Sequence, residues 1–131
     1  MMNSETIIRL LESVKAIATE AGKVIVPIAA EIGEVAAKQD GSPLTRADLA
    51  SHETIQAALE KLQPTIPILS EEGDLAGAEG KPFETFWCVD PLDGTKEFVK
   101  GLGEYTVNIA LIEQGSATLG AVYLPAQDVL Y

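Results

Sequence analysis

The chain has little cysteine, few basic residues and no long apolar run. Cys88 is the single cysteine among 131 residues, so neither an internal disulfide nor a Cys-based zinc site can form. A single thiol fits a reducing compartment. No apolar run approaches the ~18–20 residues that span a bilayer, and charged residues are spread through the N-terminal segment where a signal peptide would be apolar. We therefore expect a cytoplasmic protein with no membrane segment.

Basic residues are scarce, with 9 lysines and arginines against 20 acidic residues and a net charge of −11. This charge would repel a nucleic-acid polymer, because such binding depends on neutralising phosphates with basic side chains. A small anionic substrate would have to be accepted through bound cations or a local basic patch. The hydrophobic content of 47% is ordinary for one globular domain.

Two helical segments come first in the predicted order. The first covers residues 5–32, where apolar residues recur at helical spacing, and Gly22 and Pro27 should bend it or end it early. The second is predicted to begin with a capping box over Thr45–Asp48 and to end before Pro64. Its expected buried stripe consists of Leu49, Ile55, Leu59 and Leu62.

The rest of the chain predicts strands, because short apolar runs are separated by turn residues. The expected strands cover residues 66–69, 86–89, 105–111 and 117–124, and another apolar run begins at 129. The 105–111 and 117–124 segments should form a hairpin. Helices followed by strands indicate an α+β fold, with two helices packed on a mainly antiparallel sheet.

The most informative feature is the acidic motif Asp90-Pro91-Leu92-Asp93-Gly94-Thr95, which follows an apolar run. A strand that ends at two carboxylates three positions apart would deliver them to a turn, with the Leu92 carbonyl as a further oxygen. Mg²⁺ prefers oxygen ligands and keeps several waters. The alternative is that Asp-Pro and Asp-Gly merely form the turn and bond to its backbone. From the motif alone, both interpretations stay open.

Three other residues can contribute to such a site. One of the two glutamates Glu71 and Glu72 follows the 66–69 run and can supply a third carboxylate; the alternative is solvent exposure, which is the better expectation for Glu72. The Thr95 hydroxyl can orient an attacking water, and the Gly94 and Thr95 amides can hold phosphate oxygens if they open a helix, although Thr95 could instead be an N-cap. Asp48 can accept a proton relayed through Thr95, or can serve only the capping box.

Two further side chains are interpreted as structural. Cys88 lies within an apolar run, so we expect an inert, buried thiol. His52 lies on the second helix, where a lone histidine is more often a partly buried packing residue than a ligand.

These motifs resemble the first signature of the lithium-sensitive, magnesium-dependent phosphatases, a superfamily that includes the inositol monophosphatases. The resemblance is carried by Ser70-Glu71-Glu72 and by Trp87–Thr95. Lys96-Glu97-Phe98, Ser42–Asp48 and Glu104–Leu111 are similar to the 3′(2′),5′-bisphosphate nucleotidase branch, CysQ type. Inositol phosphatases usually have Thr-Asn-Phe where this chain has Lys-Glu-Phe.

The resemblance implies roles for the matching residues and a reaction. Glu71, Asp90, Asp93 and the Leu92 carbonyl would hold two or three Mg²⁺ ions, and Li⁺ would inhibit. Substrate contacts would come from Glu71, Leu92, Asp93, Gly94 and Thr95. Asp48 and Thr95 would activate the attacking water. The implied reaction is hydrolysis of the 3′-phosphate of adenosine 3′,5′-bisphosphate to AMP and phosphate, in sulfur assimilation or nucleotide recycling, and the alternative is an inositol-phosphate phosphatase.

The resemblance covers residues 1–131 as the N-terminal, metal- and phosphate-binding domain of a layered α/β sandwich. In the family, a second half supplies another metal-binding aspartate within a Trp-Asp motif, and Trp87, the only tryptophan here, belongs to the first motif. We therefore expect the C-terminal domain to be absent. The chain would then be an inactive half-domain, a homodimer formed through its uncovered sheet, or a half that is complemented by the missing part.

Overall fold

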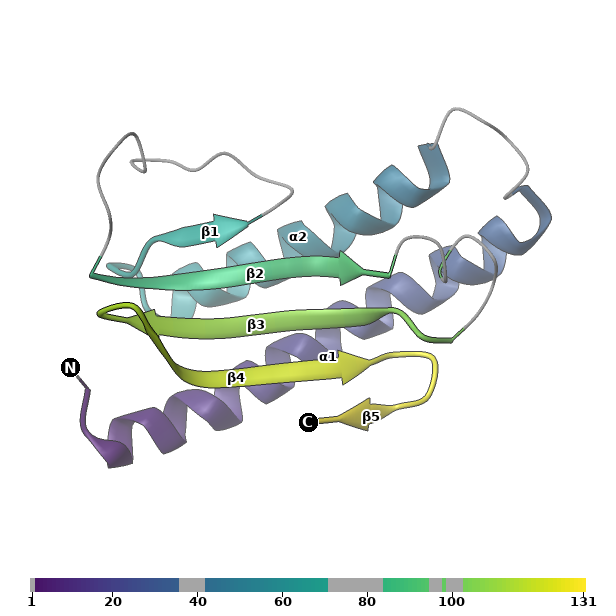
Figure 1. Ribbon diagram of the computed structural model, residues 1–131. Helices are drawn as coiled ribbons and strands as arrows, with labels where there is room; N and C mark the ends of the chain where they lie inside the picture. Colours follow the sequence, from purple (N-terminus) through teal and green to yellow (C-terminus); the bar gives the residue numbers. More distant parts are fainter. Residues whose placement is uncertain (1, 36–41, 71–83, 95–97, 99–102) are drawn as a thin grey trace.

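The computed structural model describes residues 2–35, 42–70, 84–94, 98 and 103–131, in which two helices pack on one five-stranded sheet (Figure 1). The elements are α1 (Ser4–Val35), α2 (Ser42–Leu62), β1 (Ile68–Ser70), β2 (Thr85–Asp93), β3 (Thr106–Glu113), β4 (Ser116–Leu124) and β5 (Val129–Leu130). The strands lie side by side in chain order. β1 pairs in parallel with β2, and the other neighbouring strands pair antiparallel. The predicted α+β arrangement is confirmed, and among the described helices none has the length and apolarity to cross a membrane.

Helix α1 buries an apolar stripe against the sheet. The stripe recurs every three or four residues and consists of Leu10, Val14, Ala18, Ala21 and Ile25. Of the two predicted effects of Gly22 and Pro27, the early end is wrong, because α1 continues to Val35; the bend stays a prediction. Pro27 lies on the exposed side of the helix, where the carbonyl that loses its amide partner can be hydrated.

Helix α2 begins before the predicted capping box, so that prediction is also wrong. The helix begins at Ser42, which places Thr45 and Asp48 inside it. Pro43 favours this start, because a proline in the first turn lacks only an amide that has no helical acceptor. Leu49, expected in the buried stripe, is 46% exposed. The fully buried positions recur every four residues instead, at Ala47, Ser51, Ile55 and Leu59.

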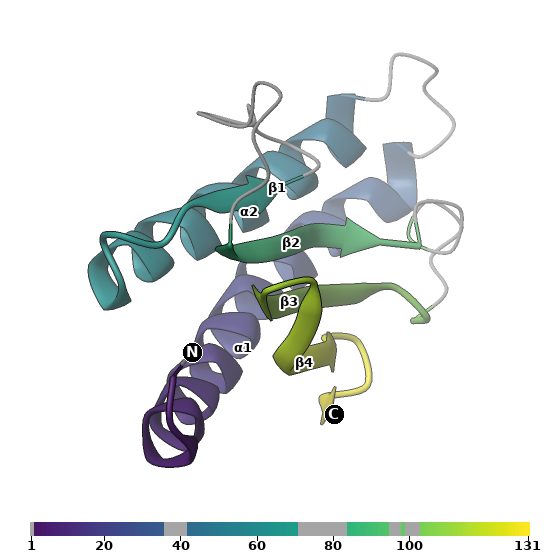
Figure 2. The ribbon, with the colours of Figure 1, turned by 60° about the vertical axis from the view of Figure 1, so that its left-hand side comes forward.

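Both helices cover the same face of the sheet (Figure 2). The side chains of β2 alternate across the sheet, so that Trp87 and Val89 are buried beneath the helices and Cys88 is exposed on the other face. The prediction of a buried Cys88 is therefore wrong. An apolar run does not distinguish the two faces of a strand, and in the described part of the chain only one face is covered.

The predicted hairpin between β3 and β4 is confirmed. Gln114 and Gly115 connect the strands with φ angles of 49° and 81°. Positive angles at both positions give a turn whose twist matches that of the strands, which is why a glycine is suited to the second position.

The close approach of α1 to β4 depends on Gly22. A methyl group added at Gly22 would lie 2.8 Å from Cδ2 of Tyr123, closer still to Cε2 of that ring, and 3.0 Å from Cγ of Pro125. The ring is held in place because the Tyr123 hydroxyl donates a hydrogen bond of 2.6 Å to Asp128, which also raises the pKa of Tyr123 to about 12. The tyrosine therefore stays protonated and remains a hydrogen-bond donor. Because its ring occupies this space, α1 can approach β4 here only with a glycine at position 22.

Replacement of Gly22 by alanine should destabilise the chain. Alanine favours a helix by up to ~1 kcal/mol over glycine, but overpacking against the Tyr123 ring costs about 1–3 kcal/mol. We expect a lower midpoint in urea unfolding. Gly120→Ala is the matched control, because its nearest neighbour is the Ile109 carbonyl oxygen at 3.8 Å, and it should unfold near the parent midpoint. A Gly22→Ala chain as stable as the parent would contradict this packing.

The exposed position of Cys88 predicts that its thiol reacts in the folded chain. We expect complete titration with an aromatic disulfide reagent without denaturant, since the sulfur lies on the face that neither helix covers. The Cys88→Ser chain is the control and should not react. A thiol that reacts only after unfolding would show that this face is covered in solution.

Candidate metal and phosphate site

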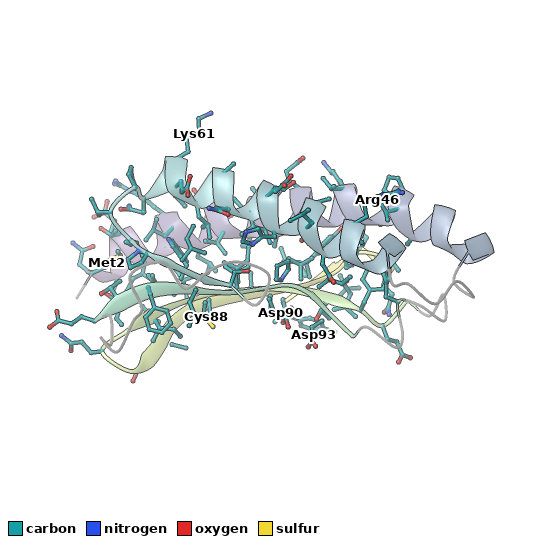
Figure 3. All side chains as sticks on the ribbon, turned by 90° about the horizontal axis from the view of Figure 1, so that it is seen from above. Met2, Arg46, Lys61, Cys88, Asp90 and Asp93 are labelled. Atoms are coloured by element: carbon teal, nitrogen blue, oxygen red, sulfur yellow. The ribbon has the colours of Figure 1, made fainter. Side chains whose placement is uncertain are left out.

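The acidic motif lies at the end of β2, where the pairing with β3 changes register. Asp90 pairs with Asn108 and Asp93 pairs with Thr106, so β2 uses one residue more than β3 over this interval. Such an extra residue is a β-bulge. In a regular strand, side chains three positions apart point to opposite faces. With the bulge, Asp90 and Asp93 both lie on the face away from the helices (Figure 3).

The position of these acids differs from the sequence prediction. They were expected on a turn after the strand, but β2 extends through Asp93. Pro91 and Leu92 lie between them and are both buried, which is the local effect of the bulge. A proline inside a strand is tolerated at a bulge, because the regular ladder of hydrogen bonds is already interrupted there and the missing amide removes no bond from it.

Helix α2 contacts the bulge through Ser51. The Ser51 hydroxyl donates a hydrogen bond of 2.7 Å to the carbonyl oxygen of Pro91, and the Ser51 side chain is fully buried. Asp48 lies three positions earlier on α2 and is half-buried. Residues three apart share one side of a helix, so Asp48 lies on the side of α2 that faces the end of β2.

His52, the next residue of α2, contacts the neighbouring strand. Its Nδ1 atom lies 3.0 Å from the Ser70 hydroxyl oxygen, within hydrogen-bond distance. Ser70 is the last residue of β1 and pairs with Val89, directly before Asp90. Helix α2 therefore holds both β1 and β2 where they approach the acidic motif.

The chain leaves β2 through a tightly packed glycine. Gly94 has a φ of 95°, and a methyl group placed on it would lie 3.1 Å from the Cα of Tyr105. Its carbonyl accepts a hydrogen bond of 2.9 Å from the Phe98 amide, the spacing of a helical turn. The Phe98 ring meets Tyr105 edge to face at 5.0 Å. These contacts hold Gly94, directly after Asp93, against Tyr105 and bond it to Phe98.

Polar side chains of β3 lie beside the acidic pair, on the face of the sheet away from the helices. The Asn108 side-chain amide donates a hydrogen bond of 2.8 Å to the Thr106 hydroxyl. Asp90 accepts a bond of 3.3 Å from the Leu92 amide, so it also serves the local backbone, as the turn interpretation proposed. This bond does not exclude metal binding, because a carboxylate has several lone pairs.

A hollow of about 270 Å³ lies on this face beside the acidic pair. Its lining consists of Cys88, Val89, Asp90, Asn108, Ile109, Ala110, Gly120, Ala121 and Val122. Small residues form much of the lining, and Asp90 and Asn108 supply its polar side chains.

The structure places part of the predicted site. Asp90 and Asp93 are brought to one face, Leu92 and Gly94 adjoin them in the chain, and Asp48 lies on α2. Two predicted members, Glu71 and Thr95, lie outside the described residues. Across residues 2–35, 42–70, 84–94, 98 and 103–131, no three His, Cys, Asp or Glu side chains gather closely enough to hold a metal ion. The described acids alone are therefore less than a full set of ligands.

The sequence interpretation missed three polar residues around the bulge, namely Ser51, Thr106 and Asn108, and it set His52 aside. Two signals could have found them. Ser51 follows Asp48 at helical spacing, and Thr106 and Asn108 are the polar positions of an otherwise apolar, alternating strand.

Comparison with known proteins agrees with these motifs. The sequence profile of the inositol monophosphatase family matches residues 7–131. The chain is 50% identical over 124 residues to the 3′(2′),5′-bisphosphate nucleotidase CysQ of Salmonella typhimurium and 44% identical over the same length to that of Escherichia coli K12, covering 93% of this chain and 50% of each relative. The crystal structure of CysQ from Bacteroides thetaiotaomicron superposes with a TM-score of 0.79 at 42% identity, over 91% of this chain and 43% of that one. The chain thus spans about half the length of these relatives.

Proposed function

Because the chain belongs to the inositol monophosphatase family, we propose that it provides the metal- and phosphate-binding half of a phosphatase. The proposed reaction is Mg²⁺-dependent hydrolysis of the 3′-phosphate of adenosine 3′,5′-bisphosphate. The observation that supports it best is the bulge in β2, which turns Asp90 and Asp93 to one face of the sheet.

The chemistry of this pair fits a hard divalent cation. Carboxylate and carbonyl oxygens are the donors that Mg²⁺ prefers, and Asp90, Asp93 and the Leu92 carbonyl would supply them, with Glu71 as the further acid. A bound Mg²⁺ ion would neutralise phosphate charge and lower the pKa of a bound water. A chain with a net charge of −11 otherwise repels an anionic substrate, so the proposal explains how phosphate can approach this face.

The other residues would orient the substrate and the attacking water. Asp48, half-buried on the side of α2 that faces the end of β2, would accept a proton relayed through the Thr95 hydroxyl. Phosphate contacts would come from Glu71, Leu92, Asp93, Gly94 and Thr95. The Gly94 contacts with Tyr105 and Phe98 support this assignment, because they hold Gly94 in place directly after the acidic pair.

The choice of a nucleotide rests on the relatives named bisphosphate nucleotidases. The second candidate is an inositol phosphate, because the family profile is that of the inositol monophosphatases. Both candidates would use the same acidic pair and would differ in the pocket beyond the phosphate.

The ligand assignment predicts that Asp93→Asn weakens magnesium binding. We expect at least an about tenfold loss of Mg²⁺ affinity, equivalent to ~1.4 kcal/mol, in calorimetric titration of the chain. Glu84→Gln is the control, since it removes the same charge just before the opposite end of β2, where Glu84 is exposed. Equal affinity of Asp93→Asn and the parent would remove Asp93 from the ligands.

The substrate assignment predicts phosphate release from adenosine 3′,5′-bisphosphate in preference to an inositol monophosphate. Because the chain spans about half of its relatives, the assay should compare the chain alone, the chain mixed with the matching second half of the Salmonella relative, and a fusion of that half after Tyr131. The complete relative serves as the positive control.

We expect the fusion to require Mg²⁺, to be inhibited by Li⁺ and to prefer the nucleotide. Equal or faster release from the inositol phosphate would overturn the nucleotide assignment. Activity of the mixture without fusion would support complementation, which stays a prediction, as does homodimerisation through the sheet.

A further inference from the structure

The backbone carbonyl of the buried Pro91, inside the bulge of β2, is bonded by a side chain of helix α2. Pro91 is fully buried, and it lies in the interval Asp90–Asp93 over which β2 changes register with β3. A buried backbone carbonyl needs a hydrogen-bond donor. The donor in this structure is the Ser51 hydroxyl on α2, at 2.7 Å.

A competing arrangement of the same strand is easily described. If β2 paired with β3 without the extra residue, Leu92 rather than Asp93 would lie opposite Thr106. Such a slip of one residue moves every following side chain to the other face of the sheet. Asp93 would then point toward the helix layer, while Asp90 stayed on the open face, and the two acids could not share a ligand.

Two bonds from successive residues of α2 hold the strands on either side of Asp90. Ser51 holds β2 directly after Asp90, and His52 holds β1 at Ser70, which pairs with Val89 directly before Asp90. The Ser51 side chain is fully buried on the helix side of the sheet, whereas the acidic pair lies on the other face. Ser51 thus acts on the pair only through the backbone of β2.

We propose that Ser51 is a positioning residue for the Asp90–Asp93 pair, because its hydrogen bond to Pro91 holds the bulge that brings both carboxylates to one face. The expected effect of Ser51 on magnesium binding rests on the proposed function, whereas its expected effect on the register of β2 does not.

The test replaces Ser51 by alanine in the whole chain and reads two properties. Proton contacts across the strands, measured by NMR without metal, report the register: the parent should show Asp93 opposite Thr106, and Ser51→Ala should show Leu92 there. Magnesium titration reports the site, and Ser51→Ala should lose affinity about tenfold or more, as Asp93→Asn does.

Thr54→Val is the matched control for loss of a hydroxyl. Thr54 lies on the same helix three residues after Ser51, but its hydroxyl bonds to the Ala50 carbonyl of its own helix at 2.9 Å. This variant should keep both the register and the affinity. Ser51→Cys retains a weaker donor of similar size and should fall between the parent and Ser51→Ala, which keeps the test informative if the alanine variant does not fold.

Each outcome decides a separate point. Persistence of the Asp93–Thr106 pairing in Ser51→Ala, with parental Mg²⁺ affinity, would overturn the positioning role even if the melting temperature fell. A changed register in a chain whose parent binds no Mg²⁺ would support the positioning role and count against the proposed function instead.

Discussion

The buried carbonyl of Pro91, inside the bulge of β2, needs a hydrogen-bond donor, and in this chain the donor is the hydroxyl of Ser51. Its bond to Pro91 joins α2 to β2 at the point where the register with β3 changes. The direction of Asp93 follows from that register, since a one-residue change reverses the face to which a strand side chain points. The shared face of the two acids therefore depends on a contact made by a helix on the opposite side of the sheet.

The packing of the two helices makes that contact possible. α1 approaches β4 closely because Gly22 leaves room for the Tyr123 ring, and α2 buries a stripe that includes Ser51, Ile55 and Leu59. Both helices cover one face, so the other face keeps Cys88, the acidic pair and the hollow accessible in the described part of the chain. A scaffold packed on one side thus presents polar residues on the other, in a chain that spans about half the length of its relatives.

Several features were predicted from local patterns, and three of the errors share one cause. The helical stripe of α1, the alternation along β3 and the hairpin at Gln114–Gly115 depend on neighbours in the chain, and these were correct. Three features were predicted wrongly: the length of α1, the exposure of Cys88 and the position of the acidic pair within a strand. All three depend on which surface faces another element. A single sequence gives periodicity but does not say which face will be covered.

The sequence by itself determined the α+β order, the family and the identity of the acids, because an Asp-Pro-Leu-Asp-Gly-Thr motif after an apolar run is a local chemical pattern. Only the tertiary structure decided that Asp90 and Asp93 share a face, and that Ser51 and His52 lie against the strands on either side of Asp90. These facts arise from pairing between β2 and β3 and from the packing of α2, and the partners lie 13 to 40 residues apart along the chain. In a regular strand, a spacing of three would place the two carboxylates on opposite faces, and the bulge reverses that outcome.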